Sequence, residues 1–141
     1  MEPFFDKFKI PIREGRGFSL SPIELKDYIS FEPKRVYYLT DLITSTGQHC
    51  HLKEEEFFVM LKGKCNAVID KGSGREDVPL DTNDAIYVPS YVWHGFKDFS
   101  GDAIILALSS TNYDPDRSDY LEDYERYLEI RDEKFRELYG I

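Results

Sequence analysis

The sequence contains few residues that could cross-link the chain or anchor it in a membrane. Its 141 residues include two cysteines, Cys50 and Cys65, which are too few for a disulfide framework. We expect both to be buried, unpaired side chains. The longest apolar run, residues 103–108, is far shorter than the ~20 residues needed to cross a bilayer. A disulfide-stabilised module and a helical membrane protein are therefore excluded.

Positive charge is also scarce. Lysine and arginine together number 18, against 27 aspartates and glutamates, which gives a formal net charge of −9. A surface of this sign repels phosphate backbones and anionic head groups, so we expect neither nucleic acid nor a membrane as a partner. The amino-terminal residues carry frequent charges and form no apolar signal segment, which predicts a cytoplasmic protein. One small anionic ligand is still compatible, because a few basic side chains can reverse the field within a pocket.

Aromatic and β-branched residues are plentiful, and they gather in short segments separated by turn residues. Residues 1–33 are interrupted by proline and glycine and are predicted to be irregular. The predicted strands are 35–40, 57–61, 65–70, 76–80, 85–88 and 102–108. The turn at 62–64 is expected to close a hairpin between the strands on either side of it. Strands of this length and spacing predict an antiparallel sandwich or barrel.

The carboxy-terminal part of the chain has a different pattern. Apolar residues recur there at helical spacing, which predicts an amphipathic helix at about 118–139. Glu122 and Arg126 would form a favourable i,i+4 pair on this helix. A short helical turn is expected at 22–28, after a Ser-Pro helix-start signal. Together these features predict one all-β domain over residues 1–141, with a helix at its carboxy-terminal end.

All three histidines of the sequence fall in two short segments. On a strand, residues two apart share a face, so His49 and His51 are expected to point the same way. Glu56 would lie on the opposite face of an unbroken strand, but a turn or bulge within 52–55 would let it converge with them. His94 would arrive from a later strand. The pattern therefore predicts a cluster of imidazoles and one carboxylate.

These segments also have ordinary structural interpretations. His94 follows Trp93 directly, and a single histidine in a strand is often a hydrogen-bonded core residue. Glu56 ends a run of three glutamates, and such runs are usually solvated. The His-x-His pair is harder to explain in this way, because imidazoles at that spacing are an established catalytic and ligand arrangement.

The spacings resemble the two-part signature of the cupin superfamily. The matching residues are His49, His51, Glu56 and Gly63 in the first part, and Pro89 and His94 in the second. Two positions depart from the signature, since Gly47 lies nearer to the first histidine than is usual and Tyr91 stands where glycine is usual. The resemblance implies a cupin jelly-roll barrel, to which the predicted carboxy-terminal helix is added.

A longer stretch, roughly residues 34–128, resembles the WxcM-like (FdtA/QdtA-type) nucleotide-sugar 3,4-ketoisomerases. The matching segments are 35–38, 62–65, 68–70, 87–89, 93–94, 98–100, 102–109, 112–114 and 119–124. Enzymes of this family move the carbonyl of dTDP-4-keto-6-deoxyglucose from carbon 4 to carbon 3 during the synthesis of deoxy- and amino-sugars. The resemblance therefore implies a cytoplasmic enzyme that binds a nucleotide sugar, forms a homodimer and works without a metal.

The same resemblance implies roles for individual residues. It makes His49 and His51 the acid/base pair, which suits a group whose pKa lies near neutrality. It favours Tyr37 as the residue that contacts the enediolate oxygens, and strand alternation places Arg35 on the same face as Tyr37. The substrate-binding residues expected on this basis are Arg35, Trp93, His94 and Lys53, and Trp93 or a nearby tyrosine is expected to stack on the thymine base.

Two departures from the family concern the chemistry of the site. The family usually has arginine where this chain has Thr46, and glutamine where it has Glu56. The first removes a candidate cation for a diphosphate, and on charge alone Lys34, Lys53 or Arg75 could replace it. The second restores a carboxylate of the kind that metal-binding cupins use as a ligand.

The sequence therefore leaves two alternatives to a metal-free isomerase. The first is a metal-dependent cupin enzyme. Its ligands, for a divalent ion such as Fe, Mn, Ni or Zn, would be His49, His51, Glu56 and His94. The second alternative is a cupin that binds a sugar nucleotide without converting it.

Overall fold

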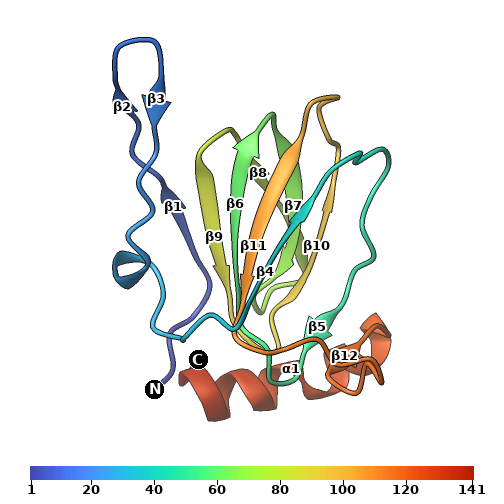
Figure 1. Cartoon of the computed structure of the whole chain (residues 1–141). Coiled ribbons are helices and arrows are strands. Elements are labelled where there is room, and N and C mark those ends of the chain that lie inside the picture. The colour runs from blue at the N-terminus through green and yellow to red at the C-terminus, as the bar shows by residue number, and fades with distance from the viewer.

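Most strands of the chain belong to one of two facing sheets. The computed structural model describes residues 1–141 and is shown in Figure 1. The larger, antiparallel sheet has the order β1 (Asp6–Lys9), β9 (Asp84–Val88), β6 (Glu56–Lys62), β11 (Ile104–Ser109) and β4 (Arg35–Leu39). The smaller sheet has the order β10 (Trp93–Lys97), β7 (Cys65–Asp70) and β8 (Arg75–Leu80). As predicted, the fold is of the jelly-roll type, although hydrogen bonds do not join the two sheets into a closed barrel.

The main core lies between the sheets and extends to the carboxy-terminal helix. It contains 15 buried residues, among them Phe58 of β6, Ile69 of β7 and Phe135 of the helix. The preceding residue of β6, Phe57, points to the other face and belongs to a second cluster of six buried residues. Partly buried apolar residues between positions 23 and 31 cover that cluster. The amino-terminal segment is therefore what buries the outer face of the larger sheet.

The predicted hairpin around residues 62–64 is wrong. The strands on either side of this turn, β6 and β7, lie in different sheets, so the turn carries the chain across the core. Gly63 has a φ of 77°, and a side chain there would overlap the Ser100 hydroxyl, so glycine suits this crossing. The hairpin forms one step later, where β7 and β8 pair from Asp70 with Arg75 onward. Local turn signals predicted where the chain reverses, but not which sheet the next strand joins.

The helix α1 (Tyr124–Tyr139) begins six residues later than predicted and ends where predicted. The carboxylate of Asp123 caps it by accepting the backbone N–H groups of Glu125 and Arg126, and Gly140 ends it with a φ of 73°. Glu122 lies before the helix, so the expected i,i+4 pair with Arg126 does not form on it. Residues 118–122 instead contain β12 (Tyr120–Leu121), which pairs with β5 (Cys50–His51).

The amino-terminal residues 1–33 are less irregular than predicted. They contain β1, which extends the larger sheet, and a hairpin of β2 (Arg13–Glu14) and β3 (Ser19–Leu20) that projects from the body in Figure 1. The predicted helical turn at 22–28 is a shorter 3-10 helix, η1 (Leu25–Asp27). Both cysteines are unpaired and buried, as expected. Among the helices, none is long and apolar enough to span a membrane.

A buried charge at the start of β9 gives a test of the fold. The Asp84 carboxylate accepts the Asp81 N–H at 2.7 Å and lies 2.9 Å from Lys9 Nζ. Burial by itself would raise the pKa of Asp84, but Lys9, the Asp81 N–H and Lys7 outweigh it and hold that pKa below its ordinary value of 3.8. A lowered carboxyl pKa stabilises the fold above about pH 4, and this contribution is lost as the pH falls through the folded-state value.

We expect Asp84→Asn to lower the free energy of unfolding by about 1 kcal/mol at pH 7, because it removes a charged acceptor. Urea titrations at pH 7 and pH 3 should show the difference from wild type shrinking at the lower pH. Asp77→Asn is the control, since the pair of Asp77 with Lys97 is exposed and should change stability by less than ~0.5 kcal/mol. A loss that is equal at both pH values would contradict this account.

Candidate active site

The three histidines meet because two distant backbone segments pair with each other. The N–H of His49 donates to the carbonyl of His94 at 3.0 Å, and the N–H of His94 donates back to the carbonyl of His49 at 2.8 Å. His51 follows two residues later, at the end of β5, and points to the same side as His49. The Nε2 atoms of His49 and His51 lie 3.1 Å apart. The expected convergence of the three imidazoles is therefore present.

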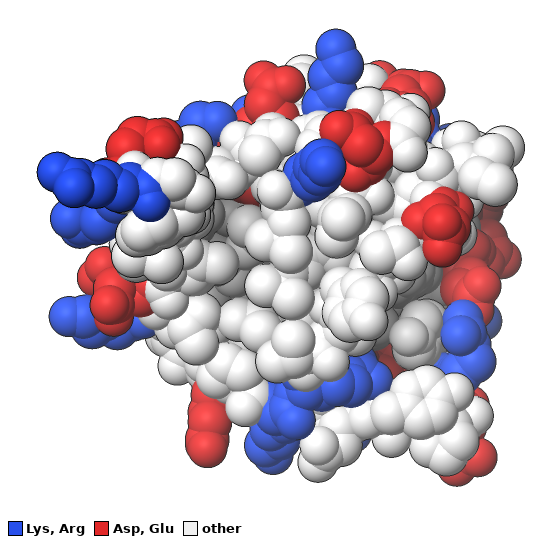
Figure 2. All heavy atoms as spheres, turned by 45° about the horizontal axis from the view of Figure 1, so that its top comes forward, with Lys and Arg blue, Asp and Glu red and all other residues white.

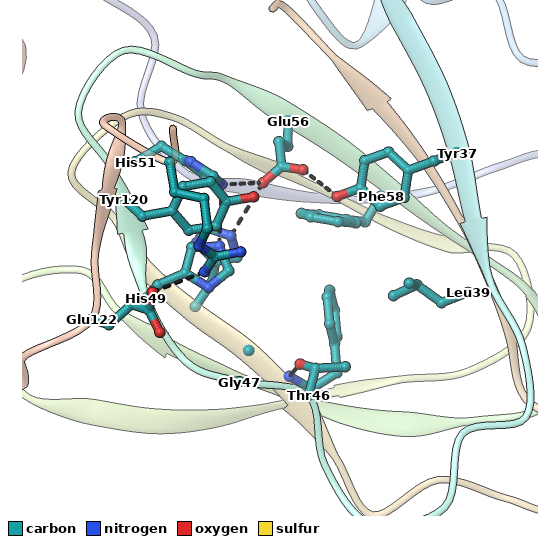
Figure 3. Close-up of a pocket in the computed structure, with 14 residues that line it drawn as sticks. Tyr37, Leu39, Thr46, Gly47, His49, His51, Glu56, Phe58, Tyr120 and Glu122 are labelled. Atoms are coloured by element: carbon teal, nitrogen blue, oxygen red, sulfur yellow. Dashed lines mark hydrogen bonds and ion pairs between the residues drawn. The ribbon is translucent and has the colours of Figure 1, made fainter. Parts of the chain in front are cut away.

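A single buried carboxylate, that of Glu56, connects this cluster. No strand continues through residues 52–55, and Glu56 begins β6 in the larger sheet. One of its oxygens lies 3.1 Å from His51 Nε2 and 3.2 Å from His94 Nε2, and the other accepts the Tyr37 hydroxyl (Figure 3). With 2% of its surface exposed, Glu56 is not part of a solvated run, and Glu54 is buried as well. The strand is interrupted at residues 52–55, as the sequence analysis expected, and this interruption lets Glu56 turn toward the histidines.

The cluster forms one wall of a cavity of about 290 Å³, which we call the main cavity because it contains the histidines. Polar groups of the cluster lie on one side, and Leu39, Phe58 and Phe96 supply an apolar side (Figure 3). Such a combination of apolar walls with a few converging polar groups is typical of sites for small organic ligands. The cavity also contains Arg117 and Glu122, which the sequence analysis did not identify.

The two neighbouring imidazoles have opposite surroundings. Burial, together with the charges of His94 and His51, lowers the pKa of His49 to about 3. Burial would also lower the pKa of His51, but the hydrogen bond and charge of Glu56 outweigh it and raise that pKa. The pKa of Glu56 is held well below its usual range, because hydrogen bonds from His51 and His94 outweigh the effect of its burial. His51 is therefore the proton-bearing member of the pair, and His49 is the neutral one.

A second carboxylate approaches His51 from the other side of its ring. Oδ2 of Asp119 lies 3.3 Å from His51 Nδ1. The Asp119 carboxylate is itself held by the backbone N–H groups of Lys53, at 2.7 Å, and Glu54, at 3.1 Å. His51 thus lies between two carboxylates, which orients its ring and favours its protonated form.

Tyr120 covers the histidine pair, and the sequence analysis missed it. Its ring centre lies 4.6 Å from that of His51 and 4.9 Å from that of His49. The pairing of β12 with β5 sets this contact, because Tyr120 is the register partner of His51. The helical spacing of the tail concealed this strand, since residues 118–123 fit the period of the helix that follows. The only available signal was the matching of segment 119–124 to the WxcM-like family.

The expected stacking of a base on Trp93 is not supported by the structure. Trp93 precedes His94 on β10, so its side chain points away from the histidines. It is 2% exposed, packs in a cluster with Cys50 and Tyr127, and donates its indole N–H to Gln48 at 3.0 Å. No face of the indole is left for a ligand, so Trp93 is a packing residue.

The expected cations lie beside the cavity and not in it. Arg35 donates from Nη2 to Glu54 at 3.0 Å, and it lines an adjoining cavity with Tyr37, Tyr113 and Tyr120. Lys53 lines a further cavity that also contains Arg35. Neither Lys34 nor Arg75 lines the main cavity, and Arg117 is the one lysine or arginine that does.

The histidine cluster has a donor set that could hold a divalent metal ion. One atom from each of His49, His51, Glu56 and His94 can be chosen so that all four lie within 4.8 Å of one another. The closest of these atoms are 3.1–3.2 Å apart. Ligands about 2.0–2.2 Å from one ion stand roughly 3 Å apart, so the residues fit such an ion.

Comparison with known proteins gives a family and a curated relative. A family model described as FdtA, WxcM-like, C-terminal, matches residues 5–132. The match includes most of residues 1–33, which lie outside the stretch 34–128 on which the resemblance was based. The TDP-4-oxo-6-deoxy-α-D-glucose-3,4-oxoisomerase of Aneurinibacillus thermoaerophilus is 37% identical over 119 residues. That match covers 82% of this chain and 84% of the relative.

Solved structures of 3,4-ketoisomerases share the fold over nearly the whole chain. A double variant of QdtA from Thermoanaerobacterium thermosaccharolyticum, in complex with TDP, has a TM-score of 0.83 and 28% identity. The match covers 96% of this chain and 99% of QdtA. A histidine-to-asparagine variant of QdtA, in complex with TDP-4-keto-6-deoxyglucose, has a TM-score of 0.82, 26% identity and the same coverage. A 3,4-ketoisomerase from Helicobacter canadensis has a TM-score of 0.80 and 26% identity, with 91% of this chain and 97% of that one covered.

The placement of Trp93 predicts a structural effect of its replacement. Trp93→Phe removes the hydrogen bond to Gln48 and leaves a small cavity, so we expect the free energy of unfolding to fall by about 1–3 kcal/mol. Because Trp93 is the only tryptophan, circular dichroism should follow the urea titration. Ile43→Val is the control, since Ile43 is 86% exposed and should change stability by less than ~0.5 kcal/mol. A variant of unchanged stability that has lost affinity for TDP would restore the stacking role.

Proposed function

The chain belongs to the FdtA family of WxcM-like, C-terminal proteins, and we propose that it is a nucleotide-sugar 3,4-ketoisomerase. It moves the carbonyl of a dTDP-4-keto-6-deoxyhexose from carbon 4 to carbon 3, a step in deoxy- and amino-sugar biosynthesis. The observation that carries the proposal is the imidazole pair, in which Nε2 of His49 and Nε2 of His51 lie 3.1 Å apart on the cavity wall. The named activities of the 37% identical relative and of the QdtA structures support it.

The first half of the reaction removes a proton from carbon 3. His49, the neutral imidazole, accepts this proton, while His51, the protonated one, donates its proton to the carbonyl oxygen on carbon 4. The electron pair of the broken C–H bond forms a double bond between carbons 3 and 4. The carbonyl π electrons move to the oxygen that receives the proton. The product of this half-reaction is a neutral enediol, and the positive charge has passed from His51 to His49.

The second half returns both imidazoles to their starting states. His49 gives its proton to carbon 4, and His51 takes the proton of the carbon-3 hydroxyl, whose oxygen becomes the new carbonyl. The two half-reactions are formally a reduction at carbon 4 and an oxidation at carbon 3 of the same molecule. No external oxidant or reductant is needed, and atoms and charge balance over the cycle.

Glu56 and Tyr37 position and stabilise the reacting groups. The Glu56 carboxylate keeps His51 protonated and lies between it and the Tyr37 hydroxyl. Because that hydroxyl donates its hydrogen to Glu56, its oxygen is free to accept a hydrogen bond from an enediol hydroxyl. His94 orients Glu56 from the opposite side through its Nε2 atom.

The adjoining cavity gives a place for the nucleotide end of the substrate. Arg35, Tyr37, Tyr113 and Tyr120 line it, and Tyr37 and Tyr120 line the main cavity as well. A sugar beside the histidines can therefore be continuous with a nucleoside beside Arg35. Tyrosine rings supply there the aromatic surface that was expected of Trp93 or a nearby tyrosine. Lys53 lies further along, in the cavity that shares Arg35.

A homodimer and a cytoplasmic location are further parts of this proposal. Exposed apolar side chains support the dimer: Val36 and Tyr38 on β4 are 62% and 69% exposed, and Phe18 and Leu20 of the projecting hairpin are 62% and 54% exposed. Sedimentation equilibrium would test it, and a monomer at micromolar concentration would contradict it. The two free cysteines are the feature that favours a reducing compartment.

A metal-dependent reaction is the second candidate, favoured by the donor set described above. His49, His51, Glu56 and His94 would hold the ion, which would supply Lewis-acid stabilisation of an enediolate. We favour proton transfer by the imidazoles themselves, because their different surroundings already supply the neutral base and the protonated acid that the reaction needs.

Replacing the proposed acid should stop the reaction without unfolding the protein. We expect His51→Asn to lower kcat for dTDP-4-keto-6-deoxyglucose by at least ~10²-fold, the lower end of the usual contribution of a general acid or base. Proton NMR in deuterated water should show, for the wild type, deuterium entering at the carbons that exchange and a new 3-keto spectrum. The variant should show neither, while its thermal unfolding and its affinity for TDP stay close to those of the wild type.

Two outcomes would contradict the assignment. Undiminished turnover by His51→Asn would remove His51 from the mechanism. Binding of the nucleotide sugar by the wild type, with no deuterium exchange and no spectral change, would favour a binding protein that does not convert its ligand.

Glu56→Gln separates proton transfer from metal catalysis. If the imidazoles carry the reaction, kcat should fall because the charge that favours protonated His51 is lost. The amide can still accept a hydrogen bond from His51, so we expect the loss in kcat to stay within about tenfold, the equivalent of about 1.4 kcal/mol. Wild type treated with chelator should retain its activity, and elemental analysis should detect less than one metal per chain. Loss of activity on chelation, restored by adding Fe, Mn, Ni or Zn, together with an inactive Glu56→Gln variant, would favour the metal enzyme instead.

A further inference from the structure

The main cavity contains one permanent positive charge in an otherwise acidic protein. The net charge of the chain is −9, and Figure 2 shows side chains of both signs around the rim of the face it presents, with no continuous basic patch. Among the residues that line the main cavity, Arg117 is the only arginine or lysine. An anionic ligand that reaches the histidines must therefore come close to this guanidinium.

The position of Arg117 depends on Tyr120. Its guanidinium lies 4.1 Å from the centre of the Tyr120 ring, and that ring lies against both catalytic histidines. Tyr120 also lines both the main and the adjoining cavity. A sugar bound at the histidines and a nucleoside bound in the adjoining cavity would be joined through a diphosphate at this tyrosine. Arg117 thus lies beside one of the two residues, Tyr37 and Tyr120, that the cavities share, in the region that the diphosphate would cross.

An exchangeable partner, the Glu122 carboxylate, pairs with this guanidinium. Arg117 Nη2 donates to the Glu122 carboxylate at 2.8 Å, and the two side chains are 52% and 61% exposed. Exposed pairs of this kind contribute little to stability, so a ligand can replace one at small cost. Arg35 differs, because its partner Glu54 is 5% exposed and held in place by Thr111.

We infer that Arg117 binds the diphosphate of the sugar nucleotide, and that the diphosphate displaces the Glu122 carboxylate from its guanidinium. This inference rests on the proposed function and adds a substrate-binding residue to it. A diphosphate carries more negative charge than one carboxylate and offers oxygens to the planar donors of arginine, so it is the stronger partner. Glu122 in turn keeps the only arginine of the cavity neutralised until an anion of higher charge arrives, which selects against ligands that carry no such anion.

The experiment compares three variants with the wild type by calorimetric titration with TDP. Arg117→Gln should weaken binding at least ~10-fold, because it removes charged hydrogen bonds to phosphate. Glu122→Gln should bind TDP as tightly as the wild type or up to about fivefold more tightly, since the competing charge is gone. The matched control is Arg75→Gln: Arg75 lies 4.1 Å from the ring of Tyr124 in the same kind of contact, but outside the cavity.

Steady-state kinetics with dTDP-4-keto-6-deoxyglucose give an independent readout. Because the diphosphate is remote from the reacting carbons, Arg117→Gln should raise KM and leave kcat within about threefold of the wild type. Thermal unfolding should be unchanged in all three variants, since each side chain is exposed.

The outcomes separate this inference from the proposed function. If the wild type converts the sugar nucleotide and Arg117→Gln matches it in TDP affinity and KM, the inference is overturned and the function stands. If Glu122→Gln weakens binding as much as Arg117→Gln does, Glu122 holds Arg117 in place and the displacement is overturned. A wild type that neither binds TDP nor converts the sugar nucleotide overturns the proposed function and this inference together.

Discussion

The burial of one carboxylate, that of Glu56, is the constraint on which the site depends. A buried charge is costly unless hydrogen-bond partners surround it, and Glu56 finds three of them on three other strands. Tyr37 comes from β4, His51 from β5 and His94 from β10, while Glu56 itself begins β6. These strands belong to both main sheets and to the short β5–β12 pair. The requirement to satisfy Glu56 therefore ties the sheets together at the point where the cavity opens.

The same carboxylate makes two similar imidazoles chemically different. His51 contacts Glu56 directly and has Asp119 on the other side of its ring, so it is held protonated. His49, two residues away, is half-buried beside two other imidazoles and is held neutral. An isomerisation that must remove one proton and supply another needs such a division, and here it comes from the surroundings of the side chains alone. Tyr120 covers the pair and extends the site toward Arg117 and the adjoining cavity.

Predictions from the sequence were correct where neighbouring residues alone fix the local structure. They were wrong where a segment distant in the chain determines the pairing of a strand. Strand alternation placed His49 and His51 on one face, and the need for a break after His51 followed from the position of Glu56. The hairpin at 62–64 was wrong because a turn signal does not tell which sheet receives the next strand. The early start of the helix was wrong because residues 118–122 satisfy helical spacing but pair with β5 instead.

The sequence by itself determined the strand-rich fold, the imidazole pair and the family, because period-two alternation and close spacing are properties of the chain alone. Tertiary structure decided which carboxylates and cations join the pair. Glu54 is close to the histidines in sequence, yet only the buried geometry shows that it binds Arg35 and holds that side chain beside the adjoining cavity. Arg117 and Tyr120 are distant in sequence from the histidines, and the pairing of β12 with β5 brings them to the site. Such long-range pairing depends on the packing of the whole chain, which no local pattern specifies.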